Sequence, residues 1–377
     1  MNKLIITYYK NRIVSVLFDG DTALEINFED PDSRLKVGDI YRGRVRDIVK
    51  NIRAAFVEIL PGTVGFMALE RGSKVKPGDE LTVQISREPI KTKDAAVTEE
   101  LTIPGKYCVL TKEYSLGASG KIKSEERREE LKALLAPLCG DHEVGFIIRT
   151  NAEEAADEDI LAEAESMIAA YEKINQRAAC STLFTRLYTE EPVYIERIRD
   201  SRTALEIITD IPEVYEKALA YCGSDTFGHT VSLYEDPQLG LDKLYRVESV
   251  IEEALSKTVW LKSGAYLVIE PTEALTVIDV NTGKFEGNGA KEDTFLKVNE
   301  EAAAEAARQL RLRNISGIVV VDFIDMKRDE SYARLKKVFS EALSEDPVKT
   351  AFADFTKLGL AELTRKKIRK SLKEQLD

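Results

Sequence analysis

Cysteine, histidine and tryptophan are scarce in this chain of 377 residues, and their scarcity argues against several kinds of site. The four cysteines form no C-x-x-C pair, so the sequence suggests neither a zinc site nor a disulfide framework. The two histidines, His142 and His229, lie in different regions and have no spacing typical of a catalytic triad or a metal site. The simplest interpretation is that the cysteines are reduced thiols, which indicates a cytoplasmic protein.

Long apolar runs are also missing. None approaches the roughly 20 residues of a membrane helix, and the apolar part of the first twelve residues is too short for a signal peptide. We therefore expect no membrane partner. A net charge of −12 argues against a protein that simply coats nucleic acid. Charge is segregated, however: residues 36–93 hold twelve Lys and Arg against seven Asp and Glu, so a basic surface can exist in an acidic protein.

The length of the chain indicates two or more domains. Residues 1–35 alternate weakly and predict two or three strands with a turn at "DGD". Residues 36–100 contain short strand-like runs separated by turn signals such as "PGT" and "KPGD". Five short strands within a basic segment of about 65 residues are typical of a small barrel of the OB kind.

The rest of the chain mixes helices and strands. In residues 102–192, "GKYCVLT" and "VGFIIRT" predict strands, and the stretches on either side of the second strand predict helices. Residues 193–255 are expected to begin with a strand, "VYIERI", and to continue with the helix "PEVYEKALAYC". From residue 256 a strand–helix–strand–helix order with the apolar strand "GIVVVDFIDM" predicts a covered sheet that is at least partly parallel.

Two of these last strands end in acids. Asp279 closes "TVID", Asp322 closes "IVVVD", and ligands gather at the carboxyl ends of strands in sheets of this class. Two carboxylates that meet there repel each other, and a divalent cation relieves the repulsion. Oxygen ligands without nearby His or Cys favour Mg²⁺ or Mn²⁺. Asn281 points to the same face as Asp279, because strand side chains repeat every two residues.

The alternative is that these acids cap helices or form ion pairs. Asp325 is expected either to support the site or to lie on the N-cap side of the next helix. Glu292 is expected in a solvated loop.

Two further groups suggest nucleic-acid binding. Phe56 and Phe66 lie on short strands of the basic segment, which also holds Lys93, and aromatic rings between cations grip single-stranded nucleic acid. The alternative is that both rings fill the barrel core. Arg149 and Thr150 end the strand "GFIIRT", where a guanidinium beside a hydroxyl can clamp a terminal phosphate. The alternative for Arg149 is an ordinary surface ion pair.

With these residues in place, nearly the whole chain resembles the RNase E/G family of bacterial endoribonucleases. The strongest part is "EALTVIDVNTGKFEG" followed by "TFLKVNEEAAAEAARQLRLRNISGIVVVDFIDM". The resemblance implies that Asp279 and Asp322 hold Mg²⁺, with Mn²⁺ as an alternative ion, and that Asn281 orients the scissile phosphate. It further implies RNA contacts at Phe56, Phe66 and Lys93. The pocket for a 5′-monophosphate is then formed by four residues, Gly105, Val109, Arg149 and Thr150.

The resemblance also implies an α+β multidomain fold. Residues 1–35 and 193–255 are similar to the two halves of an RNase-H-like subdomain. Residues 36–101 then form an inserted OB-fold RNA-binding domain and residues 102–192 a 5′-sensor domain. Residues 256–377 are similar to the family's DNase-I-like catalytic domain.

One departure from the family concerns assembly. The chain stops at Asp377, before the C-P-x-C-x-G motif whose cysteines share a zinc ion between subunits in such proteins. We therefore expect a short form without zinc, as a monomer or as a dimer held by other contacts.

The resulting hypothesis is a Mg²⁺-dependent endoribonuclease that acts on single-stranded RNA in rRNA maturation or mRNA decay. It leaves 5′-phosphate and 3′-hydroxyl ends and prefers 5′-monophosphorylated substrates. The rival interpretations are a catalytically silent RNA-binding scaffold and a metal-dependent nuclease that acts on DNA.

Overall fold

A computed structural model of the chain describes residues 2–29, 34–89, 94–223, 228–283 and 291–376. The described residues divide into two compact units. The first unit draws on residues 1–30, 204–223 and 229–377, and the second on residues 31–203 and 224–228. In the described part of the chain, no helix is both long and apolar enough to cross a membrane.

One sheet of the first unit combines the start of the chain with residues from its middle. Five strands lie in the order β15-β14-β1-β2-β3, with β1 parallel to β14. The strands are β1 (Asn2–Tyr9), β2 (Arg12–Asp19), β3 (Thr22–Glu29), β14 (Leu205–Thr209) and β15 (Thr230–Leu233). The expected turn between β2 and β3 is confirmed, and Gly20 takes a positive φ of 57° there. The helices near this sheet are α4 (Pro212–Cys222), α5 (Leu241–Leu244), α6 (Val247–Leu255) and α9 (Leu372–Leu376).

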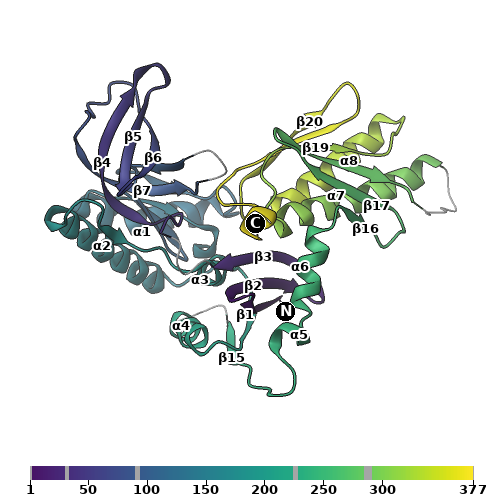
Figure 1. Cartoon of the computed structure of the whole chain (residues 1–377), viewed down its shortest axis with the longest axis horizontal. Coiled ribbons are helices and arrows are strands. Elements are labelled where there is room, and N and C mark those ends of the chain that lie inside the picture. Colours follow the sequence, from purple (N-terminus) through teal and green to yellow (C-terminus); the bar gives the residue numbers. More distant parts are fainter. Residues whose placement is uncertain (1, 30–33, 90–93, 224–227, 284–290, 377) are drawn as a thin grey trace. The chain divides into compact units, whose positions relative to one another are not determined.

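The second sheet of this unit has six strands in the order β16-β17-β18-β19-β21-β20. Figure 1 labels its strands β16, β17, β19 and β20 and the helices α7 and α8. Its strands are β16 (Thr258–Trp260), β17 (Tyr266–Pro271), β18 (Leu275–Asn281), β19 (Gly317–Asp322), β20 (Thr350–Phe355) and β21 (Ala361–Arg365). The helices α7 (Lys291–Leu312) and α8 (Asp329–Ser344) pack their apolar residues against one face. Because β18 and β19 are parallel, the expectation of a covered, partly parallel sheet is confirmed.

The second unit contains the expected barrel. Its five strands are β4 (Ile40–Val49), β5 (Ala54–Leu60), β6 (Thr63–Ala68), β7 (Glu80–Arg87) and β8 (Ala95–Thr98). Pairing of β4 with β7 closes the barrel, and β13 (Arg186–Tyr188) adds to β4 from outside. Gly65 allows a close approach within it, since a Cβ there would lie 2.7 Å from Val97 Cγ1. The prediction of a five-stranded, OB-like barrel is confirmed.

A smaller sheet completes this unit. It has the order β11-β12-β10-β9, and two helices cover one of its faces. The elements are β9 (Thr102–Pro104), β10 (Cys108–Thr111), β11 (Leu116–Ala118), α1 (Glu125–His142), β12 (Gly145–Ile148) and α2 (Asp157–Cys180). Cys108 and Cys139 are both buried in the core between helices and sheet.

The expected strand at "VYIERI" is wrong, because these residues begin the helix α3 (Val193–Asp200). Six residues are too few to separate a strand period from a helix period. Tyr194, Ile195 and Ile198 are buried and recur at helical spacing. Pro192 directly before the helix also suits a helix start. Backbone N–H groups at the start of a helix have no acceptor within it, so a proline there costs no hydrogen bond.

α3 carries a buried ion pair that ties together distant parts of the second unit. Arg199 and Glu190 are 7% and 5% exposed, and Arg199 Nη1 lies 3.1 Å from Glu190 Oε1. The backbone N–H of Glu190 donates to the fully buried Asp39 in front of β4, and Arg199 also donates to the carbonyl of Pro104 in β9. Burial raises the pKa of Glu190 above its ordinary value, although the charge of Arg199 opposes this.

We predict that Arg199→Ala lowers the free energy of unfolding by about 3–5 kcal/mol, because Glu190 is left buried without its partner. The exposed Arg202, three residues later, is the matched control, and Arg202→Ala should change the free energy by less than about 1 kcal/mol. Chemical denaturation of all three proteins measures both effects.

The loss in Arg199→Ala should also depend on pH. Below the ordinary Glu pKa of about 4.3, Glu190 is protonated in the folded and the unfolded state, so its burial carries no charge penalty. As pH rises through that value, the unfolded chain releases the proton while the folded variant retains it, and the variant loses stability relative to wild type. An equal loss at about pH 4 and pH 7 would show that lost packing, not the unpaired charge, causes the effect.

Candidate active site and nucleic-acid interface

The two strand-end acids lie directly opposite each other. In the parallel pairing of β18 with β19, Asp279 is the partner of Asp322. Their neighbours Ile278 and Val321 are buried beneath α7 and α8. Since strand side chains alternate between faces, both carboxylates lie on the face that these helices leave uncovered. The structure thus brings together the two residues that the sequence singled out.

Asn281 completes the group. Its Nδ2 donates a hydrogen bond of 2.7 Å to Asp279 Oδ2, so the amide fixes the orientation of that carboxylate. Partial desolvation, followed by the charges of Asp279 and Asp325, raises the pKa of Asp322 above its ordinary value. Desolvation, as the larger cause, and the like charges nearby both disfavour the ionised form of Asp322. A cation at this position would relieve that repulsion.

Asp325 lies three residues before Arg328, the N-cap residue of α8, and thus on the N-cap side of that helix. Glu292 takes a role other than the expected one. Glu292 does not lie in a loop: it belongs to the first turn of α7, and its Oε1 accepts the backbone N–H groups of Lys327 (3.0 Å) and Arg328 (2.7 Å). It therefore joins the start of α7 to the start of α8, while Asp325 adds negative charge near Asp322.

The residues present fit a hard divalent ion. Among the described residues, no cluster of three or more His, Cys, Asp and Glu is placed to hold a metal ion, so these residues supply fewer than three such ligands at this site. Two carboxylates with a neighbouring amide are an oxygen-rich, incomplete donor set. Mg²⁺ suits such a set, since it keeps several waters and binds through one or two carboxylates plus substrate phosphate.

On the barrel, the rings of Phe56 and Phe66 lie opposite each other on β5 and β6, with centroids 6.1 Å apart in an edge-to-face arrangement. Both are half-buried, and neither belongs to the barrel core, which is formed by their strand neighbours such as Val57 and Met67. The rings therefore face away from the core. Lys93 lies outside the described residues.

The barrel also carries a basic pocket that the sequence did not localise. It has a volume of about 690 Å³ and is lined by four cations and one acid together with apolar residues. The cations are Lys50, Arg53, Arg71 and Lys76. The excess of Lys and Arg in residues 36–93 is the signal that pointed to this surface.

In the smaller sheet, Gly105 allows a tight turn around a carboxylate. Glu163 of α2 accepts the backbone N–H groups of Tyr107 (2.8 Å) and Cys108 (3.1 Å), and a Cβ on Gly105 would lie 2.6 Å from its Oε2. Val109 lies opposite Ile147, which is 45% exposed, on the face of the sheet away from the helices. The turn therefore lies beside a small apolar surface.

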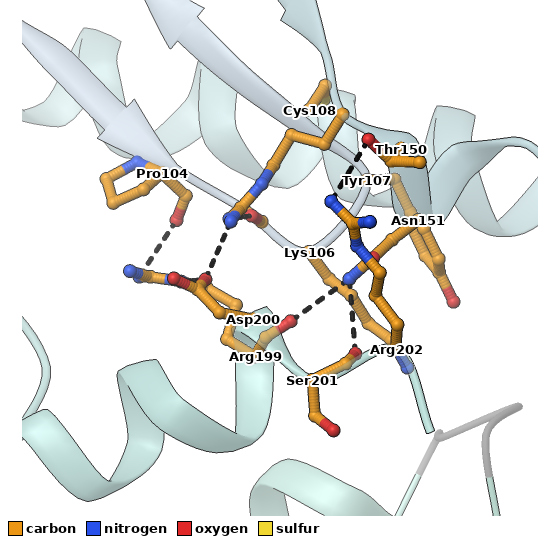
Figure 2. A network of polar contacts seen from close by, with 12 residues as sticks. Pro104, Lys106, Tyr107, Cys108, Thr150, Asn151, Arg199, Asp200, Ser201 and Arg202 are labelled. Atoms are coloured by element: carbon orange, nitrogen blue, oxygen red, sulfur yellow. Dashed lines mark hydrogen bonds and ion pairs between the residues drawn. The ribbon is translucent and has the colours of Figure 1, made fainter. Parts of the chain in front are cut away.

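Arg149 forms the ion pair that was the alternative interpretation. Its Nη2 lies 2.8 Å from Asp200 Oδ1, and its Nη1 donates to the carbonyl of Gly105 at 2.7 Å. Thr150 Oγ1 lies 3.1 Å from Ser119 Oγ. It also accepts a hydrogen bond of 3.3 Å from Arg202 (Figure 2). A second guanidinium, which the sequence did not single out, thus stands beside the threonine hydroxyl.

Asn151 holds the segment that presents these groups. It is 7% exposed, and its Nδ2 donates to the carbonyls of Arg199 (3.4 Å) and Ser201 (3.3 Å), as Figure 2 shows. These hydrogen bonds therefore join the end of α3 to the segment after β12 that carries Arg149 and Thr150.

The sequence model of the ribonuclease E/G family matches residues 102–368, well over half of the chain. The chain belongs to the ribonuclease E/G family.

Relatives in this family align with almost the whole chain. Ribonuclease G of Salmonella typhimurium (strain SL1344) is 36% identical over 384 residues, which cover 95% of this chain and 78% of the relative. Ribonuclease G of Haemophilus influenzae is 34% identical and covers 99% of this chain and 81% of the relative. Ribonuclease E of Nostoc sp. is 37% identical over 88% of this chain but only 51% of its own length.

Proposed function

We propose that this member of the ribonuclease E/G family is a Mg²⁺-dependent endoribonuclease that cleaves single-stranded RNA and leaves 5′-phosphate and 3′-hydroxyl ends. Family membership supports the general activity, since the relatives are ribonucleases by name. The observation that carries the proposal is the in-register pair of Asp279 and Asp322 with Asn281 hydrogen-bonded to it.

In this proposal, Asp279 and Asp322 hold the ion on the uncovered face of the sheet. A bound Mg²⁺ supplies charge neutralisation at the scissile phosphate and lowers the pKa of an attacking water. Asn281 keeps the Asp279 carboxylate in one orientation and offers an amide beside the phosphate without adding charge.

We predict that Asp279→Asn and Asp322→Asn each reduce RNA cleavage by orders of magnitude, because each removes a charge that the ion needs while preserving the side-chain shape. Glu362→Gln is the matched control: Glu362 pairs with Val320 and lies exposed on the same face, so its loss should leave the rate nearly unchanged. The measurement is cleavage of a single-stranded RNA, together with Mg²⁺-dependent stabilisation against heat. A near wild-type rate in either Asp variant would contradict the assignment.

The same assay separates the rival interpretations. Cleavage by wild type that EDTA abolishes excludes a silent scaffold. RNA and DNA oligonucleotides of one sequence, compared in parallel, separate a ribonuclease from a nuclease that acts on DNA.

We further propose that the barrel grips RNA through Phe56 and Phe66, with phosphates neutralised by the basic residues of the barrel. The support is that both rings lie outside the barrel core, where bases can reach them.

Phe56→Ala and Phe66→Ala should each weaken RNA binding by roughly 1–3 kcal/mol, the range for one lost base–aromatic stack. Fluorescence anisotropy with a labelled oligonucleotide measures the affinity, and circular dichroism checks that each variant is folded. Phe66→Leu is a control that retains apolar bulk but cannot stack. If it binds as tightly as wild type, stacking is not the source of the affinity.

We also propose that a 5′-monophosphate binds beside Thr150. The phosphate takes the place of the Asp200 carboxylate on Arg149 and meets the Thr150 hydroxyl and Arg202. Two guanidinium groups within one small site favour a phosphate monoester over an uncharged hydroxyl end.

Wild type should therefore cleave 5′-monophosphorylated RNA faster than the same RNA with a 5′-hydroxyl. Arg149→Ala and Arg202→Ala should each reduce this ratio while leaving the rate on 5′-hydroxyl RNA, the internal control, almost unchanged. If wild type cleaves both substrates equally fast, the pocket has no sensing role.

A further inference from the structure

The uncovered face of the six-stranded sheet carries an aromatic pair, the exposed Trp260 and the half-buried Tyr266. Trp260, the single tryptophan of the chain, ends the edge strand β16 and is 66% exposed. Its ring centroid lies 5.0 Å from that of Tyr266, at an interplanar angle of 51°. A large aromatic side chain left this accessible keeps a π-face open to a ligand.

This pair is aligned with the acidic site. Trp260 is the strand partner of Tyr266, and Tyr266 is the strand partner of Asn281, so these three residues form one row across β16, β17 and β18. Asp279 stands two residues before Asn281 on the same face. With strands about 4.8 Å apart and residues about 3.4 Å apart, the backbone of Trp260 lies roughly 12 Å from that of Asp279.

The chain after β18 passes close to Tyr266. Gly283 follows β18 with a positive φ of 57°, and a Cβ there would lie 3.4 Å from Tyr266 Cδ1 and 2.3 Å from the carbonyl oxygen of Gly264. A larger residue would collide with this backbone. Glycine at position 283 therefore lets the chain pass close to Tyr266, the ring beside which Trp260 lies.

We propose that Trp260 and Tyr266 form a stacking platform for a nucleobase of single-stranded RNA that flanks the scissile phosphate. The proposal rests on the proposed function, since it places the platform relative to Asp279 and Asp322. A base is the occupant that suits the site, because the aromatic row is continuous with Asn281 and the acid pair and Lys262 is exposed in the turn after β16. Every base has a π-face, so the platform contributes affinity and position without sequence preference.

The single tryptophan makes the test direct, because its emission reports on one residue. The protein used is Asp322→Asn in Mg²⁺, which is expected to bind RNA without cleaving it. Titration with a single-stranded RNA should change the Trp260 emission saturably, at the same concentrations at which anisotropy of a labelled RNA shows binding.

In the otherwise wild-type protein, Trp260→Ala should raise KM for RNA by roughly 5- to 150-fold, the range expected from the loss of one stacked base. Trp260→Phe should recover most of the loss, whereas Trp260→Leu should not. Shortening the RNA from the end that runs over the platform should abolish the difference between wild type and Trp260→Ala. Tyr8→Ala is the matched control: Tyr8 is 54% exposed on the other sheet of the same unit, and its loss should leave KM unchanged.

Unchanged Trp260 emission at an RNA concentration that saturates the anisotropy signal would overturn the proposal. Emission that instead depends on protein concentration without RNA, with a change of mass in light scattering, would also overturn it, because the occupant is then a second copy of the chain. Failure of the proposed function gives a different result, namely no cleavage of RNA by wild type in Mg²⁺.

Discussion

Two carboxylates side by side on adjacent strands repel each other, and much of the first unit is arranged around this pair. The parallel register of β18 and β19 forces Asp279 and Asp322 together. The apolar residues beneath them, packed under α7 and α8, hold that register, because a slip of one residue would turn the carboxylates into the core. Asn281 and Glu292 add to this order by fixing one carboxylate and by joining the starts of the two helices. A cation between the two carboxylates would relieve this repulsion.

In the second unit, the buried contacts of Arg199 and its partner Glu190 play a comparable role. Arg199 contacts Glu190 before α3 and the end of β9, and Glu190 contacts the segment before β4. The neighbouring residues Asp200 and Arg202 lie exposed or half-buried around Arg149 and Thr150. A buried ion pair thus stands next to accessible charged groups of the same unit.

Some features were predictable because local sequence and environment agree. The helix α8 has one apolar face, the strand β19 is apolar until Asp322, and the barrel strands are short and separated by Gly and Pro turns. The same agreement explains why the acids could be proposed as one site. At "VYIERI" local and global signals disagree, since a β-branched start resembles a strand while Pro192 and the buried face favour a helix. A prediction of strand or helix fails where the segment is too short to separate the two-residue period of a strand from the 3.6-residue period of a helix.

The sequence by itself determined which residues can bear charge or stack. It also determined the family, because motifs such as "VIDVNTGKFEG" can be recognised without knowledge of the fold. Only the tertiary structure decided which of these residues meet. It directs Phe56 and Phe66 away from the barrel core, brings Arg202 to Thr150 across 52 positions, and places Trp260 in one row with Asn281. The physical reason is that strand register and helix packing set these contacts, and both depend on residues far apart in the chain.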